Sequence, residues 1–326
     1  MGVHPVIRSY LDATAHEPKL PVIGLDAARE AFRRKVASVN GESNALPVNI
    51  EEHVIGAPSR TLPIRVYRAS EVPAPALLFF HGGGFVLGDL DTHDGLCREL
   101  CYRAHCTVVS VDYRLAPEHP YPAALEDALL AYQWLRGWDG VNQQLIAVGG
   151  DSAGAALAAA LALHNQGREA ERLCGQLLIY PTLEPPRRDF ASYREMDEGF
   201  GLGLEGLHWF WEQYLQGQPV STLAAPALAD DHAGLPPALV MTAQYDVLRD
   251  EGEHYAELLK RAGNRVELKR YEGMTHGFLA FSSLIDEAEQ ALEDAAYWLR
   301  LRFEEAAVHS VTTPSHQNNQ ESLEDL

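Results

Sequence analysis

Basic residues are scarce in this sequence of 326 residues. There are 26 Lys and Arg against 46 Asp and Glu, which gives a formal net charge of −20 and a pI near 5.0. This acidic excess repels phosphate backbones and anionic lipid headgroups, and no run of Lys and Arg reverses it locally. Nucleic acid and membrane surfaces are therefore disfavoured as partners, and we expect a small, neutral substrate.

Cysteines and long apolar runs are also scarce. The four cysteines, all between positions 97 and 174, are too few and too clustered for a disulfide scaffold and fit free thiols in a reducing compartment. The longest apolar run, residues 153–163, is about half the roughly 20 residues that a membrane-spanning helix needs. The first 20 residues contain Asp12 and Glu17 and lack the apolar stretch of a secretory signal. We expect a cytoplasmic protein with no membrane-inserted segment.

Short apolar runs alternate with helical patterns from residue 48 onward, in a chain whose 46% hydrophobic and 22% charged residues are typical of globular proteins. The runs expected to form strands are 48–55, 63–69, 75–82, 106–113, 144–150, 175–181, 238–246 and 265–272. The expected helices between and after them are 91–104, 122–135, 153–165, 247–261 and 283–303. This alternation indicates βαβ units and predicts an α/β fold with a mostly parallel sheet flanked by helices.

Two segments lie outside this alternation. Residues 1–45 show helical periodicity interrupted by Pro18 and Pro21, and residues 182–215 contain a helical patch but no strand-like run. They are either unrelated surface additions or parts of one cap over the carboxyl ends of the strands, where ligands bind in open α/β sheets. The polar, acidic stretch 307–326 has no periodicity and is expected to be a disordered tail. The expected core then comprises 46–181 and 216–306.

A G-x-S-x-G pattern stands directly after an apolar strand and before an Ala-rich helix. Its residues are Gly150, Asp151, Ser152, Ala153 and Gly154. In this context the serine occupies a strained strand-to-helix turn that exposes its Oγ above the sheet edge, and side chains in place of the two glycines would collide with their neighbours. Ser152 is therefore the candidate nucleophile, and the alternative is an ordinary turn that caps the helix.

A second glycine-rich motif, His81-Gly82-Gly83-Gly84, ends an earlier strand. Three consecutive glycines cost backbone entropy, so the loop must use the missing side chains. One use is to turn two N–H groups toward a developing oxyanion. A tight turn and a phosphate cradle are alternatives, although the cradle lacks the Lys-Ser/Thr of a P-loop and the G-x-G-x-x-G spacing. The G-x-S-x-G pattern downstream favours an oxyanion hole.

A serine nucleophile needs a base, and the base needs an orienting acid. In this architecture they follow in the order Ser, acid, His, each after a strand. Asp246 closes the expected strand 238–246, and His276, followed by Gly277, lies in the loop after 265–272. The rival acids fall in the first turn of the next helix, where they would serve the helix dipole, and the rival histidines lie on that helix or before a strand. These rivals are Asp250, Glu251, His254 and His232.

At this point the sequence resembles the hormone-sensitive-lipase-like (bacterial family IV) group of α/β-hydrolase carboxylesterases. The matching stretches are HGGGFVLGD (81–89), VDYRLAPEHPYPAALEDA (111–128), GGDSAGAALA (149–158), LPPALVMTAQYDVLRDEGEHYAELL (235–259) and YEGMTHGF (271–278). The resemblance implies an α/β-hydrolase fold, with an eight-stranded, mostly parallel, twisted sheet and a small helical cap made of the segments 1–45 and 182–215.

The resemblance also implies the chemistry. It makes the protein a serine hydrolase of short- to medium-chain carboxylic esters that needs neither a cofactor nor a metal. The implied catalytic residues are Ser152 as nucleophile, His276 as base and Asp246 as its orienter, and the implied oxyanion donors are the amides of Gly83, Gly84 and Ala153. The protein is expected to be a monomer or a homodimer. An amidase or deacetylase would use the same triad, and a ligand-binding receptor on this fold is a further alternative, although such a receptor is expected to have lost its base.

Three smaller features carry expectations of their own. Aromatic side chains of the insertion either line an acyl pocket or pack within the cap: Phe200, His208, Trp209, Phe210, Trp211 and Tyr214. Arg114 and Glu118 are expected to pair within a structural loop. Cys97, Cys101 and His105 recur every four residues on one helix face, but no second ligand pair has zinc-like spacing, so buried thiols are expected there and not a metal.

Overall fold

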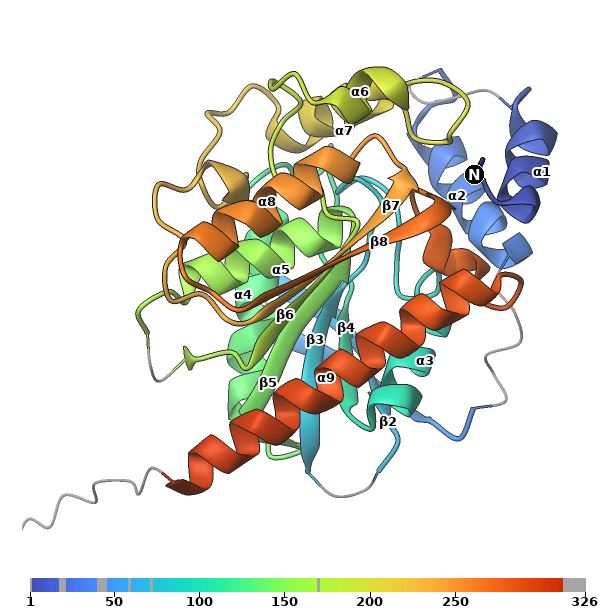
Figure 1. Cartoon of the computed structure of the whole chain (residues 1–326). Helices are drawn as coiled ribbons and strands as arrows, with labels where there is room; N and C mark the ends of the chain where they lie inside the picture. Colours follow the sequence, from blue (N-terminus) through green and yellow to red (C-terminus); the bar gives the residue numbers. More distant parts are fainter. Residues whose placement is uncertain are drawn as a thin grey trace, which may run out of the picture.

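The strands of the computed structural model form one eight-stranded twisted sheet in the order β1-β2-β4-β3-β5-β6-β7-β8 (Figure 1). The structure describes residues 2–17, 22–39, 46–57, 60–70, 73–168 and 171–312. The strands are β1 (Asn49–Ala57), β2 (Arg60–Arg68), β3 (Ala74–Phe80), β4 (Thr107–Val111), β5 (Val141–Asp151), β6 (Gly175–Ile179), β7 (Ala238–Tyr245) and β8 (Val266–Thr275). The β1–β2 and β2–β4 pairs are antiparallel and the other pairs are parallel, which confirms the predicted sheet.

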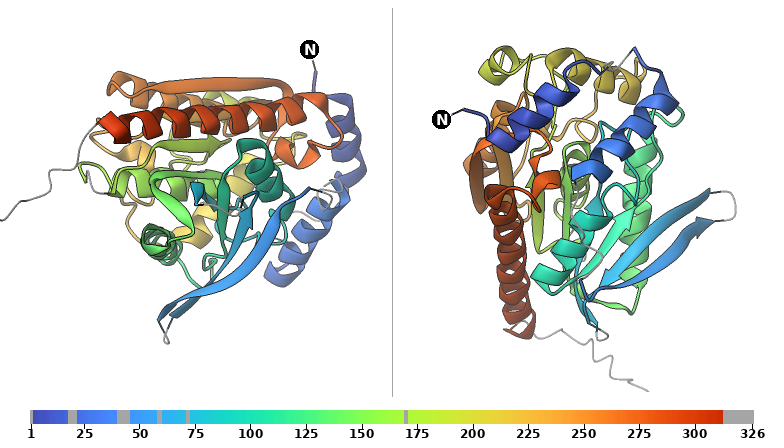
Figure 2. Two further views of the ribbon diagram at one scale, coloured as in Figure 1. Left: turned by 90° about the horizontal axis from the view of Figure 1, so that it is seen from below. Right: turned by 90° about the vertical axis from the view of Figure 1, so that its right-hand side faces the viewer.

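Helices cover both faces of the sheet (Figures 1 and 2). One face carries α4 (Ala123–Gly137), α5 (Ala153–His164) and α8 (Arg249–Arg261), and the other carries α3 (Asp94–Ala104) and α9 (Asp286–Thr312). Because side chains alternate along a strand, Leu78 packs in the cluster under α4 and α5, whereas its neighbour Leu77 packs in the cluster under α3 and α9. Burial on both faces explains why the central strands are continuous apolar runs without polar alternation.

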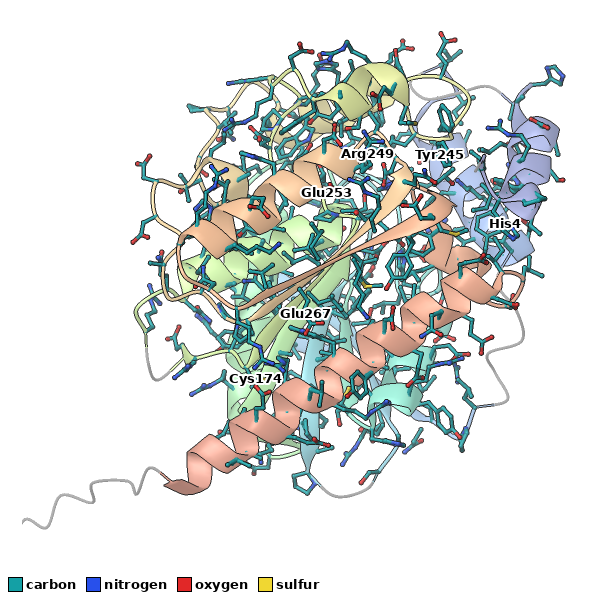
Figure 3. The ribbon with its side chains drawn as sticks, viewed as in Figure 1. His4, Cys174, Tyr245, Arg249, Glu253 and Glu267 are labelled. Atoms are coloured by element: carbon teal, nitrogen blue, oxygen red, sulfur yellow. The ribbon has the colours of Figure 1, made fainter. Side chains whose placement is uncertain are left out.

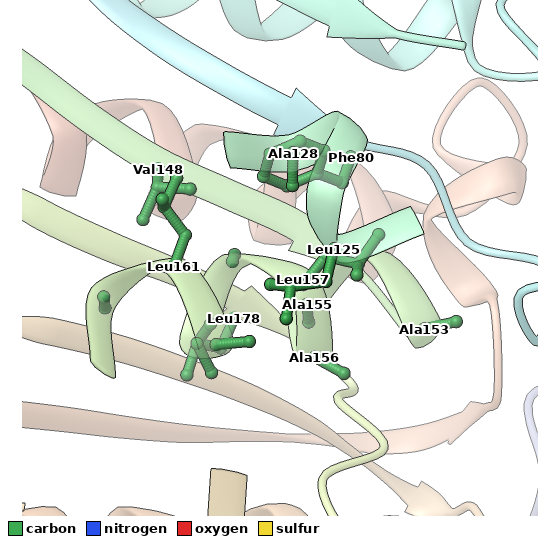
Figure 4. Close-up of a cluster of buried hydrophobic side chains, with 14 of the residues drawn as sticks. Phe80, Leu125, Ala128, Val148, Ala153, Ala155, Ala156, Leu157, Leu161 and Leu178 are labelled. Atoms are coloured by element: carbon green, nitrogen blue, oxygen red, sulfur yellow. The ribbon is translucent and has the colours of Figure 1, made fainter. Parts of the chain in front are cut away.

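Helix α5 is apolar on all sides because it is enclosed on all sides. Every residue from 153 to 162 is buried, and the small alanines let the helix lie close to the sheet, where Leu157 and Leu161 pack near Val148 and Leu178 (Figure 4). Truncating a leucine in such a cluster typically costs about 2–5 kcal/mol of unfolding free energy. The start of α5, which follows Ser152, is therefore held firmly in place.

The N-terminal helices and the insertion lie together at the end of the sheet where the parallel strands finish (Figures 1 and 2). The N-terminal helices are α1 (Pro5–Thr14) and α2 (Leu25–Val39), and the insertion contains α6 (Ala191–Glu195) and α7 (Leu204–Leu215). Arg8 joins the two segments: its Nη1 donates to the carbonyl oxygen of Gly199 at 3.1 Å, and its guanidinium lies 5.8 Å from the centre of the Phe200 ring. Two segments far apart in the sequence thus contact one another at this end.

The insertion also rests on the end of the sheet. Tyr245, the last residue of β7, lies at this end of the sheet (Figure 3). Phe200 stacks face to face on it, with ring centres 5.5 Å apart and planes 2° from parallel. The described residues also include the short 3-10 helices η3 (Pro226–Leu228), after the insertion, and η4 (Phe278–Phe281), after β8. Among the described residues, no helix combines the length and the apolarity that crossing a membrane requires.

Two expectations need correction. The expected tail begins too early, because α9 continues to Thr312 and its residues Ala306 and Ala307 pack against the core; residues 313–326 lie outside the described residues. Arg114 does not pair with Glu118. Glu118 binds Arg29 of α2 at 2.7 Å, and Arg114 binds the buried carboxylate of Asp127 at 2.9 Å and Glu126 at 2.9 Å. Both errors come from contacts with segments distant in sequence, which local patterns do not record.

Candidate active site

Ser152 stands in a strained turn between β5 and α5. Its φ is 53° and its ψ −117°, a conformation that residues with a side chain rarely adopt. The turn lies very close to the end of β3, and it is possible because Gly154 has no side chain: a Cβ atom there would collide with the carbonyl oxygen of Phe80. The surrounding packing holds this conformation, and Ser152 Oγ faces the cavity described below.

Asp246, His276 and Ser152 form one hydrogen-bonded series across the ends of three strands. His276 Nδ1 lies 2.8 Å from Asp246 Oδ2, and His276 Nε2 lies 3.0 Å from Ser152 Oγ. Asp246 is only 1% exposed, and its Oδ1 accepts from the backbone N–H of Leu248 at 2.9 Å. Because Asp246 is an acceptor, the imidazole donates from Nδ1 and presents the Nε2 lone pair to the serine hydroxyl. The structure therefore brings together the three residues selected from the sequence.

The glycine loop after β3 approaches Ser152 from the other side. Gly83 has a φ of 120° and a Cβ there would collide with the backbone of Leu87, so the loop can form only with glycine at this position. Gly83 and Gly84 line the same cavity as Ser152. Within the described residues, no hydrogen bond occupies the amide N–H groups of Gly83, Gly84 or Ala153. Three backbone donors predicted from the sequence thus remain available around the serine.

A buried polar network holds this loop against the turn at Ser152. Asp151 Oδ1 accepts from the backbone N–H of Gly82 at 2.8 Å and lies 3.2 Å from His93 Nε2. Burial would raise the pKa of Asp151, but attraction to His93 and the hydrogen bonds from His93 and Gly82 lower it below its usual value. The carboxylate therefore stays ionised and ties the two motifs together. His93 was not selected from the sequence, because nothing in its local pattern distinguishes it.

His81, the first residue of the glycine motif, does not reach the cavity. It is fully buried, its Nδ1 donates to the carbonyl oxygen of Gly82 at 2.8 Å, and its ring stacks on Tyr113 with centres 4.3 Å apart. Burial and repulsion by His93 lower its pKa to about 4. His81 is therefore a neutral packing residue that shapes the glycine loop from behind.

Ser152 and His276 lie at the floor of a cavity of about 510 Å³. We call α1 and α2 the N-terminal wall and residues 182–215 the insertion wall, because both line this cavity. Of the six aromatic candidates in the insertion, Phe200, Phe210 and Trp211 line the cavity. Tyr214 instead stacks on Phe85 inside the molecule, with ring centres 3.7 Å apart and planes 7° from parallel. Both expected uses of these residues therefore occur, in different members of the group.

The insertion wall is fastened to the core by a buried carboxyl group. Glu251, in the first turn of α8, is fully buried. Its Oε1 accepts hydrogen bonds from the backbone N–H of Leu183 and from the backbone N–H of Glu184, the latter at 3.1 Å. Its Oε2 accepts a hydrogen bond from Tyr193 Oη at 2.5 Å. Burial raises its pKa to about 7, with repulsion from Glu184 adding to the effect and the three hydrogen bonds opposing it. The sequence suggested only a helix-dipole role for Glu251, which is wrong, because this turn packs under the insertion.

The N-terminal wall is fastened by arginines at the surface. Arg29 forms a two-pronged ion pair with Glu118, at 2.7 and 2.8 Å, and its Nε donates to the carbonyl oxygen of Val86 at 2.9 Å. One turn later Arg33 Nε binds Asp89 at 2.5 Å. These contacts attach α2 to the segment that follows the glycine loop.

Comparisons with known proteins agree with this fold. A family model described as alpha/beta hydrolase fold matches residues 77–280. The chain is 44% identical over 250 residues to the carboxylic ester hydrolase LipN of Mycobacterium tuberculosis, a match that covers 71% of this chain and 65% of that protein. It is 34% identical over 311 residues to the esterase LipI of the same organism, a match that covers 92% of this chain and 95% of that protein. The structure of a hyperthermophilic esterase from the archaeon Pyrobaculum calidifontis is similar with a TM-score of 0.87 and 38% identity, covering 92% of this chain and 99% of that one.

The chain therefore belongs to the α/β-hydrolase family. These relatives, together with the quoted motifs, identify its branch as the hormone-sensitive-lipase-like group of carboxylesterases, which confirms the resemblance predicted from the sequence.

Proposed function

We propose that this chain is a serine carboxylesterase that hydrolyses short- to medium-chain acyl esters through an acyl-enzyme intermediate. The observation that carries the proposal is the series Asp246–His276–Ser152, with contacts of 2.8 and 3.0 Å, at the floor of a cavity. The names of the relatives support ester hydrolysis as the reaction class.

In the proposed reaction, Ser152 Oγ attacks the ester carbonyl carbon while His276 Nε2 takes the hydroxyl proton. Asp246 stabilises the imidazolium ion and keeps the ring oriented through Nδ1. Negative charge develops on the carbonyl oxygen, and the amides of Gly83, Gly84 and Ala153 donate to it. His276 then protonates the leaving alcohol, the C–O bond breaks, and the acyl group remains on Ser152. A water molecule, deprotonated by the same imidazole, releases the acid and restores the serine.

The walls of the cavity support a limit on acyl length. Each methylene that finds an apolar surface adds roughly 0.8 kcal/mol of binding, so kcat/KM is expected to rise over the first carbons. A longer chain meets Phe200, Phe210 and Trp211 of the insertion wall. The net charge of −20 also opposes adsorption to anionic lipid interfaces. We propose small neutral esters as substrates, with an optimum between roughly C2 and C8 acyl groups.

A panel of 4-nitrophenyl esters from C2 to C16 tests this proposal. We expect kcat/KM to peak at short or medium length and to fall steeply beyond it, with little hydrolysis of emulsified long-chain triglycerides. Phe210→Ala should move the peak to longer chains, because it removes an aromatic ring from the wall. Matched 4-nitroanilides test the amidase alternative. Equal turnover of anilides and esters, or an optimum at C16, would contradict the proposed substrate class.

A further inference from the structure

We propose that Lys35 adapts the cavity to esters that also carry a carboxylate, placed several bonds away from the ester carbonyl. The inference rests on the proposed esterase function and adds, to the neutral esters proposed above, a second class of substrate with a negative charge away from the ester bond. Two substrate types have this chemistry: half-esters of short dicarboxylic acids, with the charge on the acyl side, and acyl esters of short hydroxy acids, with the charge on the alcohol side.

Lys35 belongs to the N-terminal wall. It lines the cavity together with Phe32 and Val36 of the same helix, and its Nζ lies 5.6 Å from the centre of the Tyr10 ring, which also lines the cavity. Tyr10 is held in turn by an edge-on contact with Phe281 of η4, with ring centres 5.4 Å apart. The ammonium group therefore lies beside an aromatic ring, and Lys35 lines the same cavity as Ser152.

Lys35 differs from the arginines of α2 in that no carboxylate oxygen of the described residues lies within ion-pair distance of its ammonium group. The three arginines of α2 are all paired with carboxylates, Arg29 with Glu118, Arg33 with Asp89 and Arg34 with Glu30. Within the part of the chain that the structure describes, no carboxylate oxygen lies within 4.0 Å of Lys35 Nζ. In a chain with 46 acidic residues, a cation that lines a cavity with no described carboxylate oxygen within 4.0 Å is a specific feature.

The other cation of the cavity lining shows the contrast. Arg103 contacts Glu99 at 2.8 Å, Glu289 at 3.3 Å and Glu293 at 3.6 Å, so its charge is already neutralised. It therefore has little positive charge to offer a ligand.

Lys35 is an exposed residue that also lines the cavity. Its side chain is exposed, yet burial among surrounding protein atoms lowers its pKa, an effect that attraction to Glu17 only partly opposes. Both facts hold if the ammonium group points into an enclosed space and not into bulk solvent. An ammonium ion in such a place is incompletely solvated, and an anion from a ligand would restore the lost interaction.

A monoanionic carboxylate fits this position better than a phosphate. A lysine is a single compact charge with three donors, which matches one carboxylate group, whereas a phosphate dianion calls for further cations. The ionised Asp151 next to Ser152 repels a second anion close to the reacting carbonyl. The ligand carboxylate must therefore lie away from the ester bond, with methylene groups between them against the apolar side chains of the N-terminal wall.

Two isosteric substrate pairs test the inference. On the acyl side, monoethyl succinate is compared with ethyl 4-methylpentanoate, and on the alcohol side, 3-acetoxypropanoate is compared with 3-methylbutyl acetate. In each pair a carboxylate replaces an isopropyl group of similar shape. The quantity measured is the ratio of kcat/KM for the charged ester to kcat/KM for the neutral one, at low ionic strength. The variants are Lys35→Met, Lys35→Arg and, as a matched control outside the cavity, Lys260→Met, whose lysine pairs with Glu257.

We expect Lys35→Met to lower the ratio at least about tenfold for one of the pairs, as hydrogen bonds to charged groups warrant, and the responding pair shows on which side the carboxylate binds. Lys35→Arg should keep most of the ratio, Lys260→Met should leave it within about twofold, and 0.5 M NaCl should lower the ratio of the unaltered enzyme. The inference is overturned if Lys35→Met changes both ratios no more than Lys260→Met does, or, should that variant not fold, if salt leaves the ratio of the unaltered enzyme unchanged. Failure of the proposed function looks different, because the folded enzyme would then hydrolyse neither neutral ester.

Discussion

The floor of the cavity and its walls are held by different interactions. The floor residues Ser152, Asp246 and His276 stand at the ends of strands of one sheet, where backbone geometry and buried contacts leave each side chain a single position. The walls come from segments outside the sheet. The insertion wall depends on the buried Glu251, and the N-terminal wall depends on arginines at the surface.

This difference separates chemistry from substrate choice. A change in the floor removes a group that is proposed to react and should abolish turnover without loosening the fold. A change in the insertion wall leaves buried polar groups without partners and should act on stability and its pH dependence. A change in the N-terminal wall weakens contacts that water and salt already screen. The five predictions below test this order, beginning with the largest expected effect.

Replacing Ser152 with Ala should lower kcat by about four to six orders of magnitude, because the residues of such a series act as a unit. The thermal midpoint should not fall, since the change removes only a hydroxyl at a strained turn. A phosphonate inhibitor should label the unaltered protein at Ser152 and fail to label the variant, as mass spectrometry of the peptide can establish. Labelling at another residue with turnover retained would show that the floor has been assigned wrongly.

Asp246→Asn should lower kcat by about four orders of magnitude, because an amide in place of the carboxylate favours the wrong tautomer of His276. The control is Asp250→Asn. Asp250 lies four residues further on and binds Ser192 of the insertion at 2.8 Å and not the histidine. The control should keep activity within about tenfold. Comparable losses of kcat in both variants would mean that a change in the insertion wall affects turnover as much as a change in the floor does.

Glu251→Ala should lower the unfolding free energy by about 3 kcal/mol or more, because two backbone N–H groups and the Tyr193 hydroxyl would be buried without an acceptor. Urea denaturation measures this loss. Glu251→Gln keeps a carbonyl acceptor and removes the charge, so it should lower the unfolding free energy much less than Glu251→Ala does. An equal loss in both variants would indicate that side-chain volume, and not hydrogen bonding, fastens the insertion wall.

Glu251→Gln also tests the pH dependence. Because burial raises the pKa of Glu251 in the folded protein to about 7, the folded state holds this proton more tightly than the unfolded state does. Its contribution to stability is therefore fully present at low pH and is lost as the pH rises from about 4.5 to about 7. The thermal midpoint of the variant should decline less over this window. Burial also raises the pKa of Asp112, to about 6. Asp112 therefore makes the stability of both proteins fall as the pH rises, and the comparison between them isolates Glu251.

Arg29→Met should lower the unfolding free energy by only about 1 kcal/mol and raise KM a few-fold, because it loosens α2 from the segment after the glycine loop. High salt should shrink the difference from the unaltered protein. The matched control, Arg34→Met, removes an ion pair with Glu30 along the exposed face of the same helix. It should change the unfolding free energy and KM little. If Arg34→Met raises KM as much as Arg29→Met does, the attachment to Glu118 and Val86 is not what holds this wall.

The floor could be predicted from the sequence because its residues are marked locally. A serine between glycines after an apolar strand, and an acid and a histidine after later strands, fix the elements on which they stand, and parallel strands bring their ends together. The walls could not be predicted in the same detail. Glu251 has the pattern of any acid in a first helical turn, and its burial depends on an insertion 67 residues earlier in the chain. Glu118 finds its partner in Arg29, 89 positions away. Such contacts leave no trace in local periodicity.

The attachment of the first helix has a consequence for synthesis on the ribosome. The backbone N–H of His4, just before α1, donates to the carbonyl oxygen of Gly273 in β8 at 2.9 Å. Helix α1 is thus translated first but cannot make this contact until residue 273 has left the exit tunnel, and His276 follows only three residues later. Because the chain grows from the N-terminus to the C-terminus, Gly273, which α1 contacts, and the proposed catalytic base His276 are added within a few residues of one another. During synthesis, the α1 side of the cavity can therefore be completed only when the chain has grown almost as far as the proposed base.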